Sequence, residues 1–176
     1  MKERIKKYSS LLEETTKKIK LDLTEYFKNY NYSEPNKDIQ IVEINSEKDL
    51  DKIIYGRGFY IILTNHNFEK NKCEFQYKGL KAIYRGHSYF VKKRLFSHLA
   101  NNTYNSSRKI TEPNYKVCLK IKDGVNGINI EQEPYKKWRW MVIIHKMEKS
   151  TKLIREQTEN AFDCQFKKPI KSREKK

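Results

Sequence analysis

Two side chains in this sequence have types and a spacing that suit phosphate chemistry. Arg94 and His98 are four residues apart, so on a helix they lie side by side on one face. That face adjoins the apolar row Val91, Leu95 and Leu99, which places both side chains at the rim of the core. An arginine there can hold a phosphate through two hydrogen bonds, and a histidine can exchange a proton near neutral pH. The alternative is a solvated helix edge with a chance Arg/His pair.

Two tyrosines, Tyr60 and Tyr84, lie in segments that read as strands. The chain has 12 tyrosines, most of which should be amphipathic core or surface residues. With an ordinary pKa of about 10, a tyrosine becomes a plausible base only where neighbouring cations favour its phenolate. A concentration of positive charge around a phosphate site would have that effect.

A carboxylate that could hold a metal ion is available on the last predicted helix, where Glu156 and Glu159 are three residues apart. At about 100° per residue, Glu159 lies about 60° from Phe162, and Glu156 lies about 120° away. Glu159 therefore points more toward the core and is the first choice. Leu153 and Cys164 blur the apolar row, so Glu156 stays open. No spacing of His, Cys and Asp residues supports a zinc site.

The elements that must position these residues follow from hydrophobic periodicity. We expect one long helix over 2–30, a short helix over 47–54 capped by Ser46, and helices that begin at Ser88 and Ser150 and run to about 99 and 166. Strands are expected over 39–44, 58–65, 73–77, 81–85 and 140–146. Residues 101–114 read as a loop, and the turn at 123–127 predicts a β-hairpin between 115–122 and 128–131.

This order predicts an α/β (α+β) fold with a small central, mainly antiparallel sheet flanked by helices. The segments 58–65, 81–85 and 140–146 should join one sheet, because their continuous apolar runs need cover on both faces. An N-terminal helical arm and an inserted β-hairpin complete the prediction.

Composition narrows the classes of function. The chain has 176 residues, which suits one domain, and its 38 Lys and Arg against 22 Asp and Glu give a net charge of +16. Such a charge attracts polyanions, although a merely lysine-rich composition is the alternative. No apolar stretch exceeds five residues and no secretory signal is visible. Three widely spaced cysteines argue against a disulfide framework, so we expect a cytoplasmic protein.

Read in order, these pieces resemble the GIY-YIG nuclease family. The motifs are GFY at 58–60, YRG at 84–86, the helix HSYFVKKRLFSHL with Arg94 and His98, and an acidic helix after the strand WRWMVIIHK. The resemblance spans about 57–172. Four departures stand beside it: the segment between the two tyrosines is long, Arg85 replaces the usual Ile or Val, the insertion at about 101–137 is large, and Ser172 stands in place of a supporting Asn.

The resemblance implies a DNA endonuclease that hydrolyses phosphodiester bonds with one Mg²⁺, for which Mn²⁺ can substitute. It implies Tyr60 as the general base, with His98 relaying its proton, and Tyr84 as the residue that positions the water or the phosphate. It also implies that Arg94 stabilises charge on the phosphate and that Glu159 holds the metal, with Glu156 as the alternative.

The resemblance further implies double-stranded DNA as the partner and no membrane. Residues 1–55 are expected to form an arm for DNA contact or dimerisation, residues 56–172 the nuclease domain, and residues 167–176 a mobile basic tail. The expected DNA contacts are Arg85, His87, Lys92, Lys93, Arg108, Lys109, Lys116, Lys120 and Lys122.

A compact chain with one active site looks most like a restriction-type member of the family. Cutting both strands then calls for a homodimer on a two-fold-symmetric site. The alternatives are a repair, mobile-element or phage-defence nuclease, or a non-catalytic basic nucleic-acid-binding protein.

Overall fold

A single five-stranded antiparallel sheet forms the centre of the computed structural model, which describes residues 1–107, 119, 121 and 128–172. The strand order is β1-β5-β2-β4-β3. The strands are β1 (Ile39–Ile44), β2 (Gly58–Thr64), β3 (Gln76–Tyr77), β4 (Leu80–Ser88) and β5 (Trp140–Lys146). The predicted α/β (α+β) class is confirmed, and the three segments expected in one sheet are β2, β4 and β5.

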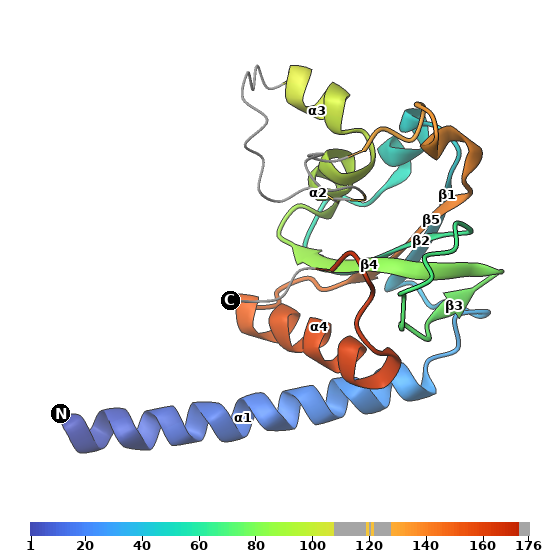
Figure 1. Cartoon of the computed structure of the whole chain (residues 1–176). Helices are drawn as coiled ribbons and strands as arrows, with labels where there is room; N and C mark the ends of the chain where they lie inside the picture. Colours follow the sequence, from blue (N-terminus) through green and yellow to red (C-terminus); the bar gives the residue numbers. More distant parts are fainter. Residues whose placement is uncertain (108–118, 120, 122–127, 173–176) are drawn as a thin grey trace.

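Helices cover both faces of this sheet (Figure 1). They are α1 (Lys2–Asn29), η1 (Glu47–Lys52), α2 (Val91–Leu99), α3 (Asn101–Ser107), η2 (Tyr135–Lys137) and α4 (Lys152–Phe166). The helices α2 and η1 pack on one face, and α1 and α4 pack on the other. In η1, Ser46 and Asp49 form the reciprocal capping box that the sequence predicted.

Alternation along β2 divides the core into two layers. All seven residues of β2 are buried, which explains its unbroken apolar sequence. The odd-numbered side chains pack with Phe27 of α1 and Phe162 of α4. The even-numbered side chains Tyr60 and Ile62 face Leu95 of α2. The side chain of Tyr60 is therefore presented to α2 rather than to α4.

One extra residue in β4 changes which of its side chains face α2. Ile62 pairs with Tyr84 while Leu63 pairs with Ala82, so Ile83 is the bulged residue. Ile83 and Tyr84 consequently both lie in the layer beside α2, whereas regular alternation would turn Tyr84 toward α4. The bulge thus brings Tyr84 to the same layer as the even-numbered side chains of β2.

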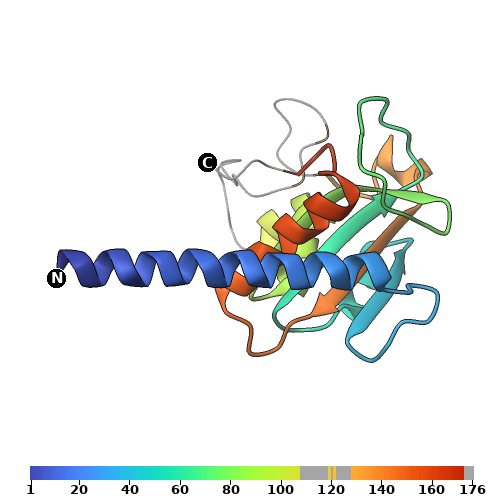
Figure 2. The ribbon, with the colours of Figure 1, turned by 90° about the horizontal axis from the view of Figure 1, so that it is seen from below.

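The long helix α1 is anchored at its C-terminal end only. Its residues 1–15 are all exposed, and Figure 2 shows this part projecting from the rest of the molecule. At the anchored end, the buried ring of His145 hydrogen-bonds the Tyr26 hydroxyl through Nδ1 (3.2 Å) and the Tyr32 hydroxyl through Nε2 (3.0 Å). Burial lowers the pKa of His145 to about 3, so the ring is neutral at ordinary pH. The large exposed apolar side chains on the projecting part are Met1, Ile5, Tyr8, Leu11 and Leu12.

Two predicted helix starts were wrong by a few residues. The helix α2 begins at Val91, and the Ser88 hydroxyl accepts a hydrogen bond from the N–H of Phe90 before the helix starts. The helix α4 begins at Lys152 and is capped by Thr151. Ser150 instead serves as a hydrogen-bond acceptor for the Arg155 side chain, five residues later, which a capping pattern does not reveal.

Other predicted segments differ in extent. Residues 101–107 form the helix α3 where a loop was expected, and the strand expected over 73–77 is reduced to β3. Most of the predicted hairpin (residues 115–118, 120 and 122–127) lies outside the described residues. No helix within the described part of the chain is long and apolar enough to cross a membrane.

The first residues of the expected basic tail lie along β4 and are hydrogen-bonded to it. The N–H of Lys171 donates to the Ile83 carbonyl (2.9 Å), and the Ser172 hydroxyl accepts from the N–H of Arg85 (3.0 Å). These bonds tie the segment that follows α4 to the outer edge of β4. Residues 173–176 lie outside the described residues.

Candidate active site

Three of the predicted site residues form one buried group on the α2 side of the sheet. The Tyr60 hydroxyl lies 2.8 Å from Nε2 of His98, and both side chains are buried. The rings of Tyr60 and Tyr84 are stacked at 6.2 Å, and the Tyr84 ring lies 4.7 Å from the His98 ring. The strands β2 and β4 and the helix α2 thus each contribute one member.

The glycine of the YRG motif makes room for this group. Gly86 pairs with Tyr60 across the two strands. A Cβ atom at position 86 would lie 2.6 Å from the Tyr60 hydroxyl oxygen and 3.1 Å from Cε1 of Tyr84. Any larger residue would therefore displace the hydroxyl that contacts His98.

A carboxylate approaches from the opposite layer. Glu159 on α4 has a side chain that is 8% exposed, and its Oε2 lies 3.3 Å from Nη1 of Arg85. Glu156 has a 29% exposed side chain, and its Oε1 lies 3.9 Å from the Lys152 ammonium. The predicted orientation of the two acids is confirmed: Glu159 faces the sheet and Glu156 faces outward.

Arg85 is held mainly by another acid. Its Nε and Nη2 donate to the two carboxylate oxygens of Asp163 at 3.0 and 2.5 Å. Because Asp163 takes both hydrogen bonds of this edge, Glu159 makes only the single, longer contact. Asp163 is therefore the principal partner of Arg85, and Glu159 is a further one.

The charges of Arg94 and Glu159 both reach the Tyr60 hydroxyl. Burial raises the pKa of Tyr60 well above its ordinary value, and the nearby Tyr84 and Glu159 raise it further, while Arg94 opposes the rise. The hydroxyl is consequently protonated in the free protein. A role as base requires that the proton move to a neighbour, and His98 is the side chain in hydrogen-bond contact.

The chemistry of Glu159 fits a magnesium ion held by one carboxylate. Magnesium keeps several waters and takes further oxygens from substrate phosphates, so it does not need a cage of protein ligands. Among the described residues, no three His, Cys, Asp or Glu side chains are grouped as such a cage would require. Glu159 is buried and is oriented by an arginine, as a single ligand should be.

Arg94 connects this group with the surface. It lines a hollow of about 400 Å³ at the junction of β4 and α2. The other lining residues are His87, Ser88, Tyr89, Phe90 and Lys152. The mouth of the site is thus basic and partly aromatic, which suits a nucleic-acid backbone.

The expected DNA contacts have varied positions. Arg85 is buried between two carboxylates, which corrects its expected place on the DNA-facing surface. Lys92 is paired with Asp51 at 3.0 Å, and the Lys93 ammonium lies 5.9 Å from the centre of the Phe90 ring. His87 lines the hollow. Outside the described residues lie Arg108, Lys109, Lys116, Lys120 and Lys122.

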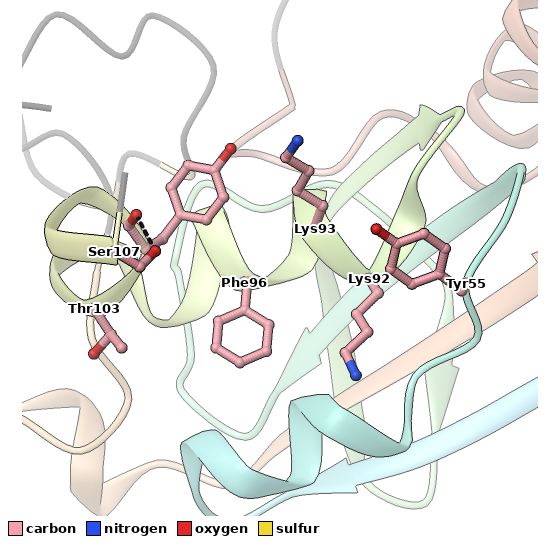
Figure 3. A pocket seen from close by; sticks show the side chains of 7 residues that line it. Tyr55, Lys92, Lys93, Phe96, Thr103 and Ser107 are labelled. Carbon is pink, nitrogen blue, oxygen red and sulfur yellow. Dashed lines mark hydrogen bonds between the residues drawn. The ribbon is translucent and has the colours of Figure 1, made fainter. Parts of the chain in front are cut away.

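A second hollow, of about 320 Å³, lies between α2 and α3. Figure 3 shows the Lys92 and Lys93 side chains leaving α2 in different directions beside it. Its lining residues are Tyr55, Lys92, Lys93, Phe96, Thr103, Tyr104 and Ser107, which include no carboxylate and no histidine. The first hollow differs in that His87 and Arg94 line it.

Two charged residues of α4 were not predicted from the sequence to lie near the site. Arg155 and Asp163 are respectively four residues before and four after Glu159, so the three form a charged row on one helix face. The burial of Arg155 and Glu159, with Asp163 half-buried, was unexpected, because charged side chains are usually solvated. The spacing was nonetheless a signal available in the sequence.

Comparison of the chain with protein-family models, curated proteins and solved structures found no match. Any assignment of activity must come from the residues themselves. The convergence of Tyr60, Tyr84 and His98 with Arg94 and Glu159 is the observation on which such an assignment rests.

Proposed function

We propose that this protein is a divalent-metal-dependent DNA endonuclease with a GIY-YIG-type active site, and that it is a restriction-type, sequence-specific enzyme. The observation that carries the proposal is the buried group of Tyr60, Tyr84 and His98 between β2, β4 and α2, with the charges of Arg94 and Glu159 acting on the Tyr60 hydroxyl. Scattered side chains would have favoured an ordinary basic domain. A buried tyrosine–histidine pair with an arginine and a carboxylate nearby suits phosphoryl chemistry.

Proton transfer follows from the Tyr60–His98 contact. As a water molecule attacks phosphorus, its proton passes to the Tyr60 oxygen while the tyrosine's own proton passes to Nε2 of His98. Tyr60 thus acts without a stable phenolate, which its burial disfavours. A new P–O bond forms, and the bond from phosphorus to the leaving oxygen breaks.

Cleavage also requires that the negative charge developing on the phosphate be stabilised. Arg94 stabilises the oxyanion as the transition state forms, and Tyr84 positions the water or the phosphate. Glu159 would hold Mg²⁺, or Mn²⁺ in its place, and the ion would supply charge stabilisation at the phosphate oxygens when bound.

Double-stranded DNA is the proposed partner. The net charge of +16 supports it, and affinity should fall steeply with salt because lysine and arginine contacts release counterions. A homodimer would supply the second active site that cutting both strands needs. The projecting part of α1 is the proposed dimer contact.

One observation favours a second candidate, a non-catalytic nucleic-acid-binding protein: the burial of Tyr60 opposes its ionisation. Incubation with plasmid DNA, with and without Mg²⁺ or Mn²⁺, separates the two. We expect metal-dependent conversion of supercoiled DNA to linear product. Binding without cleavage under every metal condition would leave the second candidate.

Mapping the product ends then separates the biological roles. A single recurrent sequence at the ends supports a restriction-type enzyme. Ends set by a structure or a lesion in the DNA would favour a repair, mobile-element or phage-defence nuclease of the same chemistry.

A further inference from the structure

Arg155 is a fully buried arginine in which three of the five N–H donors have no hydrogen-bond partner among the described residues. Its Nη1 donates to the carbonyl and the hydroxyl of Ser150 at 2.7 and 2.9 Å. Its Nε and Nη2 are buried and have no hydrogen-bond partner among the described residues. A buried cation with unpaired donors is costly, so such a group calls for an anion.

A second arginine converges on the same point. Nη1 of Arg57 donates to the same Ser150 carbonyl at 3.1 Å. Neither Arg57 nor Arg155 forms an ion pair with a carboxylate in the part of the chain that the structure describes. Two guanidinium groups that share one acceptor repel each other unless a negative charge lies between or beside them.

The N-terminal end of α4 adds to this field. The first turn of the helix has no acidic residue and begins with Lys152. The partial positive charge of a helix N-terminus ordinarily favours acidic side chains or bound anions, and Lys152 and Arg155 are the opposite choice. The local sequence therefore concentrates positive charge where the backbone already supplies some.

Tyr89 joins these cations to the hollow described above. Cζ of Arg155 lies 4.0 Å, and Cζ of Arg57 4.9 Å, from the centre of the Tyr89 ring. The nearby Arg155 guanidinium does most to lower the pKa of the Tyr89 hydroxyl, with Arg57 and Lys152 contributing. Tyr89 is 47% exposed as a residue. Its ring covers the buried Arg155 guanidinium and forms part of the wall of the hollow.

Arg85 shows what the unused edge of Arg155 can bind. In Arg85, the Nε and Nη2 edge holds both oxygens of the Asp163 carboxylate side-on. The same edge of Arg155 has no hydrogen-bond partner in the part of the chain that the structure describes. Two parallel N–H donors in this geometry match two oxygens of a phosphate equally well.

We infer that this end of the hollow is a phosphate subsite, in which Arg155, Arg57 and Lys152 bind one phosphate after the Tyr89 ring rotates aside. Arg94 lines the same hollow and its charge reaches the Tyr60 hydroxyl, so the subsite would take a backbone phosphate next to the one that is cleaved. The identity of the phosphate as DNA rests on the proposed function, whereas binding of phosphate as such does not.

Inorganic phosphate is the direct probe. We expect sodium phosphate to raise the Tm of the full-length protein more than sodium chloride does at equal ionic strength. Arg57→Gln and Lys152→Gln, both at exposed positions, should each weaken phosphate binding about tenfold. Arg155→Lys keeps the charge but loses the planar edge and should weaken it similarly. Arg139→Gln, at an exposed position before β5, is the matched control and should bind as the parent does.

The DNA experiment separates failure of the subsite from failure of the proposed function. One outcome is that the parent protein binds phosphate, the Arg57 and Lys152 variants do not, and no DNA is cleaved. This outcome would support the subsite and overturn the nuclease proposal. Another outcome is that the parent protein cleaves DNA while phosphate raises its Tm no more than chloride does. That result would overturn the subsite alone. Equal phosphate affinity in the parent, Arg57→Gln and Arg155→Lys would also overturn it, and this result does not depend on how well Arg155→Lys folds.

Discussion

At the residue scale, a substitution of Glu159 tests DNA binding and DNA cleavage separately. Glu159→Gln keeps nearly the same volume but removes the charge that would hold a metal ion, and Asp163 still holds Arg85. The cleavage rate should fall about 10²-fold or more, the loss typical of a removed electrostatic contact, while DNA binding survives. Plasmid cleavage and gel-shift titrations measure the two effects.

Glu156→Gln is the matched control for that variant, with the same chemical change three residues earlier on the same helix. Its side chain points outward toward Lys152, so activity should be retained. An inactive Glu156 variant beside an active Glu159 variant would move the metal site to Glu156. Equal cleavage rates for both variants and the parent would contradict the assigned site.

A glycine substitution tests the Tyr60–His98 contact directly. Alanine at Gly86 would place its Cβ 2.6 Å from the Tyr60 hydroxyl oxygen, so the ring must move away from His98. We expect at least tenfold slower cleavage and about 1–3 kcal/mol lower stability from overpacking. Gly56→Ala meets nothing within 4 Å and should change neither quantity. Unchanged activity in Gly86→Ala would mean that the contact is not needed.

At the element scale, the anchor of α1 should respond to pH through His145. Its pKa is about 3 in the folded protein, against about 6.5 in the unfolded chain, because burial disfavours the charged ring. Between these values the unfolded chain binds more protons, so stability falls as the pH falls from about 6.5 toward 3 and is unaffected by this group above 6.5. The slope from this single group is at most about 1.4 kcal/mol per pH unit.

Denaturant unfolding at pH 7 and pH 5 checks this expectation, because most carboxylates remain ionised in that window. His145→Gln should lower stability at pH 7 and flatten the dependence between the two values. The exposed His66, which stacks on Trp138, offers the control His66→Gln, whose slope should match the parent's. Parallel slopes in the parent and His145→Gln would show that the ring already titrates freely.

Local pattern was sufficient to predict most elements. The limits of β1 and β5 agree with the predicted strands, and α1 begins at its predicted residue, because each depends on its own apolar spacing. The orientation of Glu159 also followed from helix geometry. These features are encoded within one element at a time.

Features that depend on two distant segments could not be predicted in this way. The bulge at Ile83 is a property of the pairing with β2, so sequence alternation did not reveal that Arg85 would face α4. The docking of Ser172 on the backbone of Arg85 joins residues 87 positions apart.

At the scale of the whole molecule, the projecting part of α1 should mediate self-association. Its 15 exposed residues are about 22 Å long, and an isolated helix of that length with exposed Ile and Leu is marginal in water. Ile5, Tyr8 and Leu12 follow a spacing of three and four that suits packing against the same helix of a second copy. We expect a dimer that dissociates on dilution, measured by analytical ultracentrifugation.

The double variant Ile5→Glu and Leu12→Glu should be monomeric at concentrations where the parent is dimeric. Leu21→Glu changes an exposed leucine on the opposite side of α1 and should leave the dimer intact. Loss of the dimer in all variants alike would point to helix destabilisation, and a monomeric parent would contradict the contact altogether.

The bulge in β4 also makes the site tolerant of some length changes and intolerant of others. Side-chain faces follow the parity of residue count along a strand, so deleting Ile83 would invert that parity for every residue between the bulge and one end of β4. The connection 65–75 between β2 and β3 carries no such constraint, since pairing of the strands sets their register whatever the loop length. A lineage could therefore lengthen the segment between the two tyrosines freely, while a single-codon deletion inside β4 would separate Tyr84 from Tyr60 or exchange the places of Tyr84 and Arg85.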